Sequence, residues 1–330
     1  MHDYYPYFRG KQNELITIRD NARLLKSAGF VPIIEPVKQS TSGLERAIDE
    51  VVKEDGACIL IVNPNCGDHC ADSTAIKKLI NKDFASAASL SVGILLKSSM
   101  SANDVRALCE EYPSRDVTLI HYGFEEGSNL AQILINHTNV TRHVFIEDFC
   151  GKLYRKHFRD DGRSRILIRD GFQRRKNREH GEHPSELFSD LHVTFGEESM
   201  DGFGDFLIVG DDYFESGGPA YAVAIHLTYI DQKRDEAMYI HHFVSNRTDT
   251  QADPAGKFEE ALTKLVAEVN KPSSPILRSV AVEEFLDLHN NTTKYHRVPH
   301  FPGLGYVKKL SMQHHIETLA DYFRRHREAK

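Results

Sequence analysis

The apolar residues of this chain fall into short, β-branched runs that are separated by longer amphipathic stretches. Runs such as CILIV, VGILL and VTLI are apolar almost without interruption, which is typical of strands buried on both faces of a parallel sheet. The stretches between them place apolar residues at helical spacing, as at Leu15, Ile18, Ala22 and Leu25. The pattern predicts strands at residues 4–9, 31–37, 57–63, 90–97, 117–122, 142–148, 165–170 and 205–210.

The order of these elements predicts an α/β fold, a (β/α)8 TIM-like barrel over residues 1–219. The first six strands start at residues 4, 31, 57, 90, 117 and 142, which is a nearly even repeat of strand and helix. An open doubly wound sheet is the alternative, but no G-x-G-x-x-G motif follows any predicted strand. The barrel is therefore the favoured architecture.

After residue 210 the pattern changes to two apolar runs, at residues 221–230 and 238–245, which are joined by a charged turn. These runs predict an antiparallel hairpin. The amphipathic stretches that follow predict helices, the last of them over residues 310–326. We expect residues 220–330 to form a β-hairpin plus helices, either packed on the barrel or completing it.

Composition narrows the class of protein. Hydrophobic residues make up 40% of the chain and charged residues 27%, as in an ordinary soluble globular protein. No apolar run approaches the ~20 residues that span a bilayer, so no membrane partner is expected. A net charge of −7 does not suit a dedicated nucleic-acid-binding protein. Five scattered cysteines and the lack of a signal-peptide pattern predict free thiols and a cytoplasmic location.

Polar residues stand at or just beyond the ends of the predicted strands, where barrel enzymes carry their functional groups. Carboxylates there suit acid–base chemistry or a hard divalent cation, and basic residues suit a phosphate. The candidate catalytic residues are Glu35, Asp148, Asp170, His121 and Lys97. Glu35, Asp148 and Asp170 are also the candidate ligands for Mg²⁺ or Mn²⁺. The candidate ligand- or phosphate-binding residues are Arg9, Lys11, Asn63, Asp211 and His242.

Glu35 is the most suggestive of these residues, because it lies within the apolar segment VPIIEPV, where a carboxylate is costly to bury. Strands of soluble proteins often end at polar residues, however, so some of the candidates could instead be turn caps.

The chain has 18 histidines, so some of them are expected to cluster by chance. His241 and His242 are neighbours in a predicted strand and point to opposite faces, so only one of them, His242, is expected to line a pocket. His315 adjoins an apolar stripe of the last helix and is expected to be a buried structural residue. The segment from Cys66 to Cys70 (CGDHC) lacks the second ligand pair of a zinc knuckle, so a loop is the favoured interpretation.

Residues 152–178 contain eleven Lys or Arg and three Asp. Arg174, Arg175 and Lys176, near the C-terminal end of this basic stretch, are the candidate partner- or nucleic-acid-binding patch. It could bind a protein partner, nucleic acid or a phosphorylated ligand, or it could be a solvated segment paired with acids elsewhere in the chain.

Several segments together, among them YYPYFRGKQNEL, IRDGFQRRKN, GGPAYAVAIHLTY and YIHHFVS, resemble a poorly characterised bacterial family. This family is distantly similar to the phage-type Beta protein family, and the resemblance covers nearly the whole chain. It implies a cytoplasmic bacterial protein of a mobile-element or anti-phage defence locus, acting with a small nuclease-like partner encoded beside it. It implies no particular catalytic residue.

Two hypotheses of function follow. The first is a metal-assisted phosphoester hydrolase acting on a phosphorylated or nucleotide-derived ligand at the barrel mouth. The alternative is a non-catalytic barrel scaffold or sensor that binds a partner protein. Direct binding of nucleic acid is the least favoured, because the chain is acidic overall.

Overall fold

The computed structural model describes residues 3–215, 220–290 and 301–328, and the chain divides into two units. The barrel unit comprises Met1–Asp170 and Leu191–Phe206, and the second unit comprises Gly171–Asp190 and Leu207–Lys330. The chain therefore leaves the barrel before its last strand, returns to complete it, and leaves again. The sequence predicted a single division after residue 219 instead.

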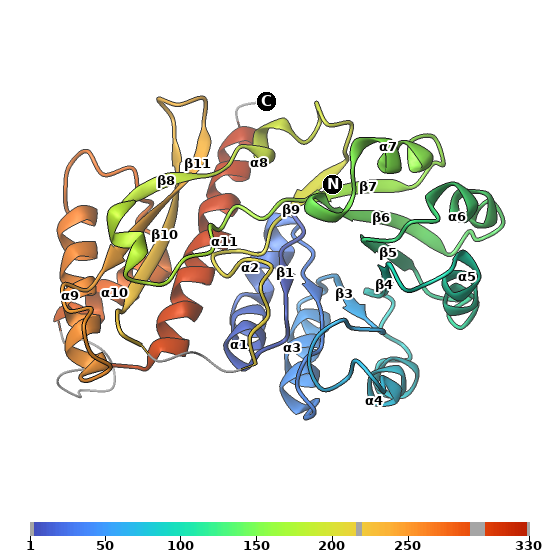
Figure 1. Cartoon of the computed structure of the whole chain (residues 1–330), viewed down its shortest axis with the longest axis horizontal. Helices are drawn as coiled ribbons and strands as arrows, with labels where there is room; N and C mark the ends of the chain where they lie inside the picture. Colours follow the sequence, from blue (N-terminus) through green and yellow to red (C-terminus); the bar gives the residue numbers. More distant parts are fainter. Residues whose placement is uncertain (1–2, 216–219, 291–300, 329–330) are drawn as a thin grey trace. The chain divides into compact units, whose positions relative to one another are not determined.

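The parallel strands of the barrel unit form one sheet in the order β1-β2-β3-β4-β5-β6-β7-β9. Hydrogen bonds from Tyr5 N–H to the Phe203 carbonyl (2.8 Å) and from Tyr7 N–H to the Asp205 carbonyl (2.9 Å) join the last strand to the first. The predicted TIM-like α/β barrel is thus confirmed (Figure 1). Its strands are β1 (Tyr7–Phe8), β2 (Ile33–Ile34), β3 (Cys58–Ile61), β4 (Leu90–Lys97), β5 (Val117–Tyr122), β6 (Val140–Ile146), β7 (Ser164–Ile168) and β9 (Gly202–Gly204).

Helices connect successive strands and lie outside them, as Figure 1 shows for α4, α5 and α6. The helices of the barrel unit are α1 (Gln12–Asp20), α2 (Ala22–Ala28), α3 (Ser42–Lys53), α4 (Thr74–Lys78), α5 (Ala102–Glu110), α6 (Gly127–Leu134), α7 (Lys152–Arg155) and α8 (Leu191–Thr194). Shorter helical segments are the π-helix η1 (Leu79–Asp83) and the 3₁₀ helices η2 (Glu147–Phe149) and η3 (Lys156–Phe158).

The interior of the barrel is a packed core. Alternate residues of the strands point inward, among them Ile33, Ile59, Leu95 and Ile120, and all four are at most 1% exposed. The residues between them point outward to the helices. A barrel of this kind leaves only its loops to carry functional groups.

The last barrel strand differs from the prediction. A strand was expected at residues 205–210, because FLIV is an apolar run, but the structure has β9 at Gly202–Gly204. A side chain at Gly204 would place its Cβ 2.2 Å from the Tyr5 carbonyl oxygen, so close approach to the first strand requires glycine there. The apolar run itself turns away, with Leu207 at a φ of 51°.

The second unit contains an antiparallel sheet in the order β10-β11-β8. Its strands are β8 (Ser185–Ser189), β10 (Ala224–Asp231) and β11 (Ala237–Val244). The predicted hairpin is confirmed as β10 and β11. The third strand, β8, was not predicted, and it reaches the sheet by the first passage of the chain out of the barrel.

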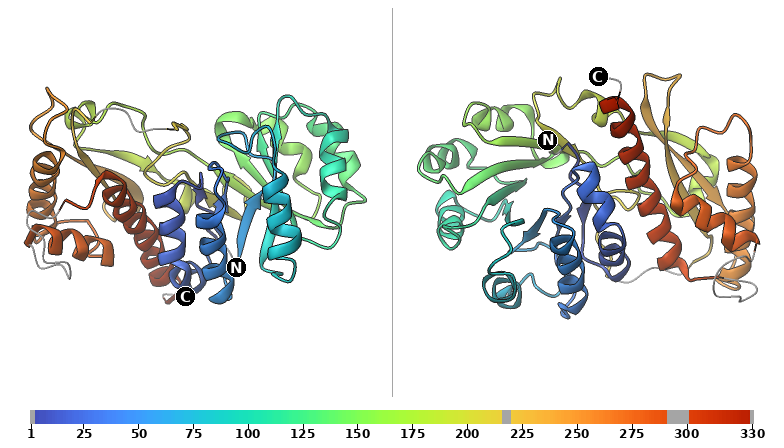
Figure 2. Two further views of the ribbon diagram at one scale, coloured as in Figure 1. Left: turned by 90° about the horizontal axis from the view of Figure 1, so that it is seen from below. Right: turned by 180° about the vertical axis from the view of Figure 1, so that it is seen from behind.

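Helices α9 (Pro254–Val269), α10 (Val280–Asn290) and α11 (Leu304–Glu328) complete the second unit, with the 3₁₀ turn η4 (Glu179–Glu182). One face of the hairpin packs on these helices through an apolar core that includes Ile225, Leu227 and Phe243. Figure 2 shows α11 beside the sheet. The Nδ1 of His315 lies 3.0 Å from the Thr228 hydroxyl, and His315 is fully buried, which confirms its expected structural role.

Two further expectations concern the whole chain. The five cysteines are free thiols, as predicted. Within residues 3–215, 220–290 and 301–328, no helix combines the length and apolar character that crossing a bilayer requires.

Candidate metal centre

Glu35 follows β2 and is 1% exposed, so the sequence was right to single it out as an unusual carboxylate. Its Oε2 accepts the Tyr7 hydroxyl at 2.8 Å, and Arg9 Nε lies 3.6 Å from the same oxygen. Its Oε1 accepts the backbone N–H groups of Asn65 (2.7 Å) and Cys66 (3.2 Å). These bonds anchor the loop after β3 to the end of β2, and they explain the burial of the charge without a ligand.

The other candidates at this end of the barrel also make contacts within the protein. The Asn63 amide bonds both the N–H and the carbonyl of Leu95, at 2.8 Å each, and so continues the pairing of β3 with β4. Lys97 Nζ donates to the Pro64 carbonyl at 2.9 Å. Lys11 occupies the N-cap position of α1, where its side chain makes no capping hydrogen bond, and is half-buried. Of the predicted mouth residues, the structure therefore brings Arg9 and Glu35 into direct contact.

The three carboxylates expected to share a metal are differently placed. Asp148 is exposed in η2, and its neighbour Glu147 makes a two-pronged ion pair with Arg169, at 2.5 and 3.1 Å. Asp170 is half-buried and ends the first segment of the barrel unit. Among the described residues, the group of His, Cys, Asp or Glu side chains that could hold a metal includes neither of them, nor Glu35.

His121 points outward from the barrel, because its neighbour Ile120 fills the interior. It is fully buried in a hydrogen-bonded chain: Tyr154 Oη lies 2.6 Å from His121 Nδ1, and His121 Nε2 lies 2.9 Å from His143 Nδ1. His143 Nε2 in turn lies 2.8 Å from Asp161 Oδ2. The prediction that His121 lies at the barrel mouth does not fit this outward orientation.

The basic stretch is divided between the two units. Arg155 and Arg165 are buried, at 4% and 6% exposure. Arg174 pairs with Asp212 at 2.8 Å, and Arg175 pairs with Glu186 at 2.5 Å, while Lys176 is exposed. Much of this positive charge is thus neutralised within the protein. Asp211 is half-buried in the second unit.

The group of side chains that could hold a metal ion lies in the second unit. It consists of His180, Glu186 and His242 and is called the histidine–glutamate cluster. One possible ligand atom from each of the three residues lies within 4.8 Å of the other two. Local pairing explains why they meet. Glu186 on β8 is opposite Ile240 on β11, and η4, which carries His180, directly precedes β8. His242 follows two residues along β11.

Three short contacts define the proton positions in this cluster. His242 Nε2 lies 3.0 Å from Glu186 Oε1, and His242 Nδ1 lies 2.7 Å from Nδ1 of His226 on β10. A carboxylate cannot donate, so His242 carries its proton on Nε2 and its Nδ1 is the acceptor. The single proton between the two histidines therefore belongs to His226. Arg175 Nη1 donates to the same Oε1 of Glu186.

The environment favours neutral imidazoles beside an ionised carboxylate. Burial, together with His242 and Arg175, lowers the pKa of His180 to about 4. Burial also lowers the pKa of His226 and of His242. At Glu186 burial acts to raise the pKa, but hydrogen bonds from Arg175 and His242 outweigh it and lower the pKa overall. Neutral imidazole and ionised carboxylate are the protonation states that bind metals.

His180 adds an independent sign of a ligand. Its side chain is 1% exposed, and its buried Nδ1 has no hydrogen-bond partner among the described residues. The ring packs against His242 and Phe172, with centroids 4.3 and 5.5 Å apart. A buried nitrogen without a partner costs about 1–3 kcal/mol, and a metal ion would satisfy it.

The spacing of the cluster fits a small transition-metal ion. Zinc–nitrogen and zinc–oxygen bonds of ~2.0–2.2 Å in a tetrahedron separate neighbouring ligand atoms by roughly 3.3 Å. The 3.0 Å between His242 Nε2 and Glu186 Oε1 is close to this value. Since all three ligand atoms lie within 4.8 Å of one another, a shift of at most about 1.5 Å would bring any pair to this separation.

Comparisons with known proteins add no relative. No protein-family model matches the chain, and neither the curated proteins nor the solved structures give a match. The family resemblance of the sequence stays a prediction.

The sequence pointed to only one member of the cluster. His242 was selected because one of two adjacent strand histidines should line a pocket, whereas His180 and Glu186 were missed. The available signal was the segment from His180 to Glu186 (HGEHPSE), which holds two histidines and two glutamates in seven residues. Linking it to His242 requires the long-range pairing of β8 with β11.

Proposed function

We propose that this protein is a metal-dependent phosphoester hydrolase whose metal ion is bound by His180, Glu186 and His242. The observation that carries the proposal is the convergence of two buried imidazoles and a carboxylate, one of the imidazoles having a nitrogen with no partner in the described structure. The proposal therefore moves the metal site from the barrel mouth to the second unit.

Two histidines and one carboxylate leave an open coordination position, as in catalytic zinc sites. Imidazole ligands favour Zn²⁺, Mn²⁺ or Fe²⁺ over Mg²⁺, which prefers oxygen ligands. A metal ion held by His180, Glu186 and His242 would lower the pKa of a water molecule to ~7 and so supply the nucleophile for phosphoester hydrolysis. The overall reaction would add water across the phosphorus–oxygen bond and give the free alcohol and a phosphate with one ester bond fewer.

Arg175 supports a phosphorylated substrate. Its side chain is 24% exposed and donates through Nη1 to Glu186, which orients the carboxylate and places a guanidinium beside the cluster. Guanidinium groups bind phosphate oxygens in a bidentate manner. A phosphorylated or nucleotide-derived ligand fits this environment, and the bacterial defence setting suggested by the sequence remains part of the proposal.

The test is metal binding to the purified full-length chain. After removal of metal with a chelator, titration with Zn²⁺ and with Mn²⁺ should give one ion per chain, and His180→Gln and Glu186→Gln should abolish that binding. His326→Gln is the matched control, because His326 also pairs with a glutamate, Glu236, at 3.1 Å, outside the cluster. Hydrolysis of bis(p-nitrophenyl) phosphate should follow metal content.

Two results would overturn the proposal. One is stoichiometric metal binding that survives both cluster substitutions. The other is binding that is lost in Glu35→Gln but kept in Glu186→Gln, which would return the metal to the barrel mouth. Circular dichroism of each variant establishes that it is folded.

A second candidate function is binding of a partner protein by the barrel unit. Apolar side chains are exposed there, with Leu153 on α7 at 83% and Ile135 after α6 at 75%. Such side chains are enriched at interfaces when they form a patch. Co-purification with a neighbour-encoded protein, lost in Leu153→Asp and kept in Leu187→Asp, would support it; Leu187 is exposed on β8 of the second unit.

A further inference from the structure

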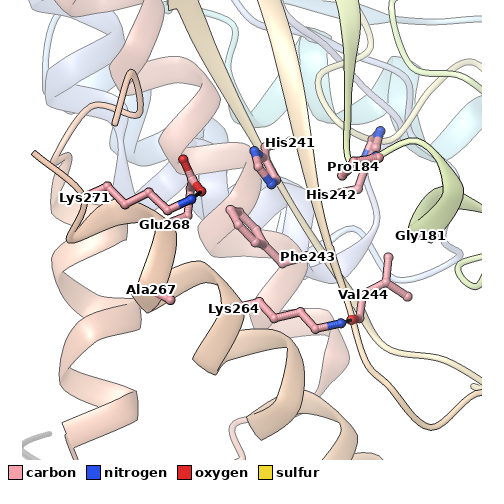
Figure 3. Close-up of a pocket in the computed structure, with 10 residues that line it drawn as sticks. All are labelled: Gly181, Pro184, His241, His242, Phe243, Val244, Lys264, Ala267, Glu268 and Lys271. Atoms are coloured by element: carbon pink, nitrogen blue, oxygen red, sulfur yellow. Dashed lines mark hydrogen bonds and ion pairs between the residues drawn. The ribbon is translucent and has the colours of Figure 1, made fainter. Parts of the chain in front are cut away.

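A pocket of about 310 Å³ opens in the second unit between α9 and the end of β11 (Figure 3). His241, Phe243 and three residues with charged side chains, Lys264, Glu268 and Lys271, line one part of it. Gly181, Pro184 and His242 line another part, and Figure 3 shows Pro184 and His242 across the strand from Glu268 and Lys271. The pocket therefore reaches both sides of β11, and the expectation that only one of His241 and His242 would line a pocket is wrong.

The end of the β8–β11 ladder creates this opening. The last paired residues of the ladder are Ser185 and His241, and one further bond joins His242 N–H to the Pro184 carbonyl at 2.9 Å. Beyond that point the chain before β8 turns through η4. Phe243 and Val244 thus lie beyond the described ladder with β8, and both line the pocket.

The pocket carries a small excess of positive charge. Lys264 and Lys271 contribute two positive charges and Glu268 one negative charge. Lys264 donates to the Val244 carbonyl at 2.6 Å, which holds its ammonium group at the end of β11, and Lys271 pairs with Glu268 at 2.5 Å. The His241 ring stacks on Phe243 with centroids 4.3 Å apart, which fixes the orientation of its nitrogens. Ammonium and imidazole groups are suitable donors to a phosphate.

The pocket adjoins the histidine–glutamate cluster through His242, which belongs to both. Two further lining residues, Gly181 and Pro184, lie within two residues of His180 and Glu186 in the chain. The volume of the pocket is at the lower end for ligand sites, which suits a small molecule better than a nucleic-acid strand.

We propose that Lys264, Lys271 and His241 bind a terminal phosphate of the substrate while a second phosphoester of the same small molecule lies at the metal centre. This inference rests on the proposed function. It assigns the substrate class as a small ligand with two phosphate groups, one held and one hydrolysed. The bound phosphate contributes affinity, and so it should affect KM more than kcat.

The experiment uses two chromogenic esters that share one scissile bond. Thymidine 5′-(p-nitrophenyl phosphate) is compared with the same ester carrying a 3′-phosphate, on the metal-loaded full chain. The added phosphate should lower KM about tenfold or more, the value of a charge-assisted hydrogen bond. Lys264→Gln and Lys271→Gln should remove that gain and leave the metal stoichiometry at its wild-type value.

The matched control is Lys53→Gln, because Lys53 makes the same i,i+3 pair with a glutamate, Glu50, on α3 of the barrel unit. Lys264→Arg keeps the charge and should keep the gain, which separates binding from a loss of folding. The inference is overturned if metal-dependent hydrolysis occurs but the 3′-phosphate gives no advantage in KM, or if the advantage survives both glutamine substitutions.

Titration of the metal-free protein with inorganic phosphate separates this inference from the proposed function. Phosphate binding that weakens in Lys264→Gln supports the pocket even if no metal binds and no ester is hydrolysed. Metal binding and hydrolysis without lysine-dependent phosphate binding support the metal centre and overturn the pocket.

Discussion

His226 and His242 stand directly opposite each other on β10 and β11, with their Nδ1 atoms 2.7 Å apart. When both rings are neutral, a single proton lies between the two Nδ1 atoms. His242 carries its own proton on Nε2, from which it donates to Glu186, so the proton between the rings is bonded to His226. A metal ion on His242 Nε2 would displace the Nε2 proton. Both rings would then change tautomer: His242 would donate from Nδ1 and His226 would accept, so His226 would stabilise the metal-bound form of His242.

His226→Phe should therefore weaken Zn²⁺ binding by about 10–100-fold, although His226 is not itself placed among the ligands. Calorimetric titration of the metal-free chain measures the change, with His137→Phe in the barrel unit as the control. An unchanged dissociation constant in His226→Phe would mean that His226 does not position His242.

The barrel unit should lose stability as the pH falls below about 6.5. Burial lowers the pKa of both His121 and His143, so the unfolded chain takes up protons in this range before the folded chain does. Each neutral histidine makes its full contribution to the free energy of unfolding when the pH is above its pKa in the unfolded chain. That contribution declines by at most ~1.4 kcal/mol per pH unit as the pH falls toward its pKa in the folded protein. Asp161, whose pKa is lowered to about 2, keeps its full stabilising contribution between pH 7 and pH 5 and loses it only as the pH falls from 3.8 toward 2.

Hydrogen exchange measures this effect locally. After correction for the intrinsic dependence of exchange on pH, amides of α7 and η3 should lose protection between pH 7 and pH 5. Amides of α3, which is remote from this chain of hydrogen bonds, provide the internal control. Equal protection of the α7 amides at pH 7 and at pH 5 would contradict the prediction.

Glu35→Ala should destabilise the barrel unit without affecting the metal centre. The change leaves the N–H groups of Asn65 and Cys66 and the Tyr7 hydroxyl without their acceptor, at a cost of about 2–5 kcal/mol. Glu50→Ala, which removes an exposed ion pair with Lys53, should cost less than ~1 kcal/mol. Urea unfolding gives both values. Loss of Zn²⁺ binding in folded Glu35→Ala would count against the assignment of the metal to the second unit.

Gly67, in the loop after β3, should tolerate alanine poorly. It has a φ of 80°, and a Cβ there would lie 2.1 Å from the Val37 carbonyl oxygen. Gly162 has a similar φ of 77°, but its Cβ would meet nothing within 4 Å. Gly162→Ala should cost about 1 kcal/mol from backbone strain alone. Gly67→Ala should cost roughly twice that or more, because backbone must also move. Equal midpoints of urea unfolding for the two variants would show that the contact with the Val37 carbonyl adds nothing to the cost of the substitution at Gly67.

Much of the barrel could be predicted because its signal is local. A strand such as β4 (Leu90–Lys97) is a continuous apolar run, and its neighbours repeat the pattern at even intervals. The closing strand β9 carries no such signal, since glycine at residue 204 is required by contact with Tyr5 and lowers the β propensity of the segment.

The candidate sites divide in the same way. Arg9 and Glu35 follow neighbouring parallel strands, so their approach to 3.6 Å follows from topology. His180 and Glu186 reach His242 only through the pairing of β8 with β11, which no periodicity in the sequence reveals. The outward orientation of His121 could have been predicted from the sequence, because successive side chains of a strand alternate in direction and Ile120 points inward.

The two passages of the chain out of the barrel have a consequence for synthesis on the ribosome. Ser185–Ser189 emerges before the hairpin with which it pairs, so this segment stays without its sheet until residue 244 has been made. The barrel strands, in contrast, are complete by residue 204 and can close while the rest is still being translated. A gene truncated after Phe206 would encode all the barrel strands together with His180 and Glu186 but without His242. The remaining C-terminal fragment would carry His242 alone, so neither fragment by itself contains the complete histidine–glutamate cluster.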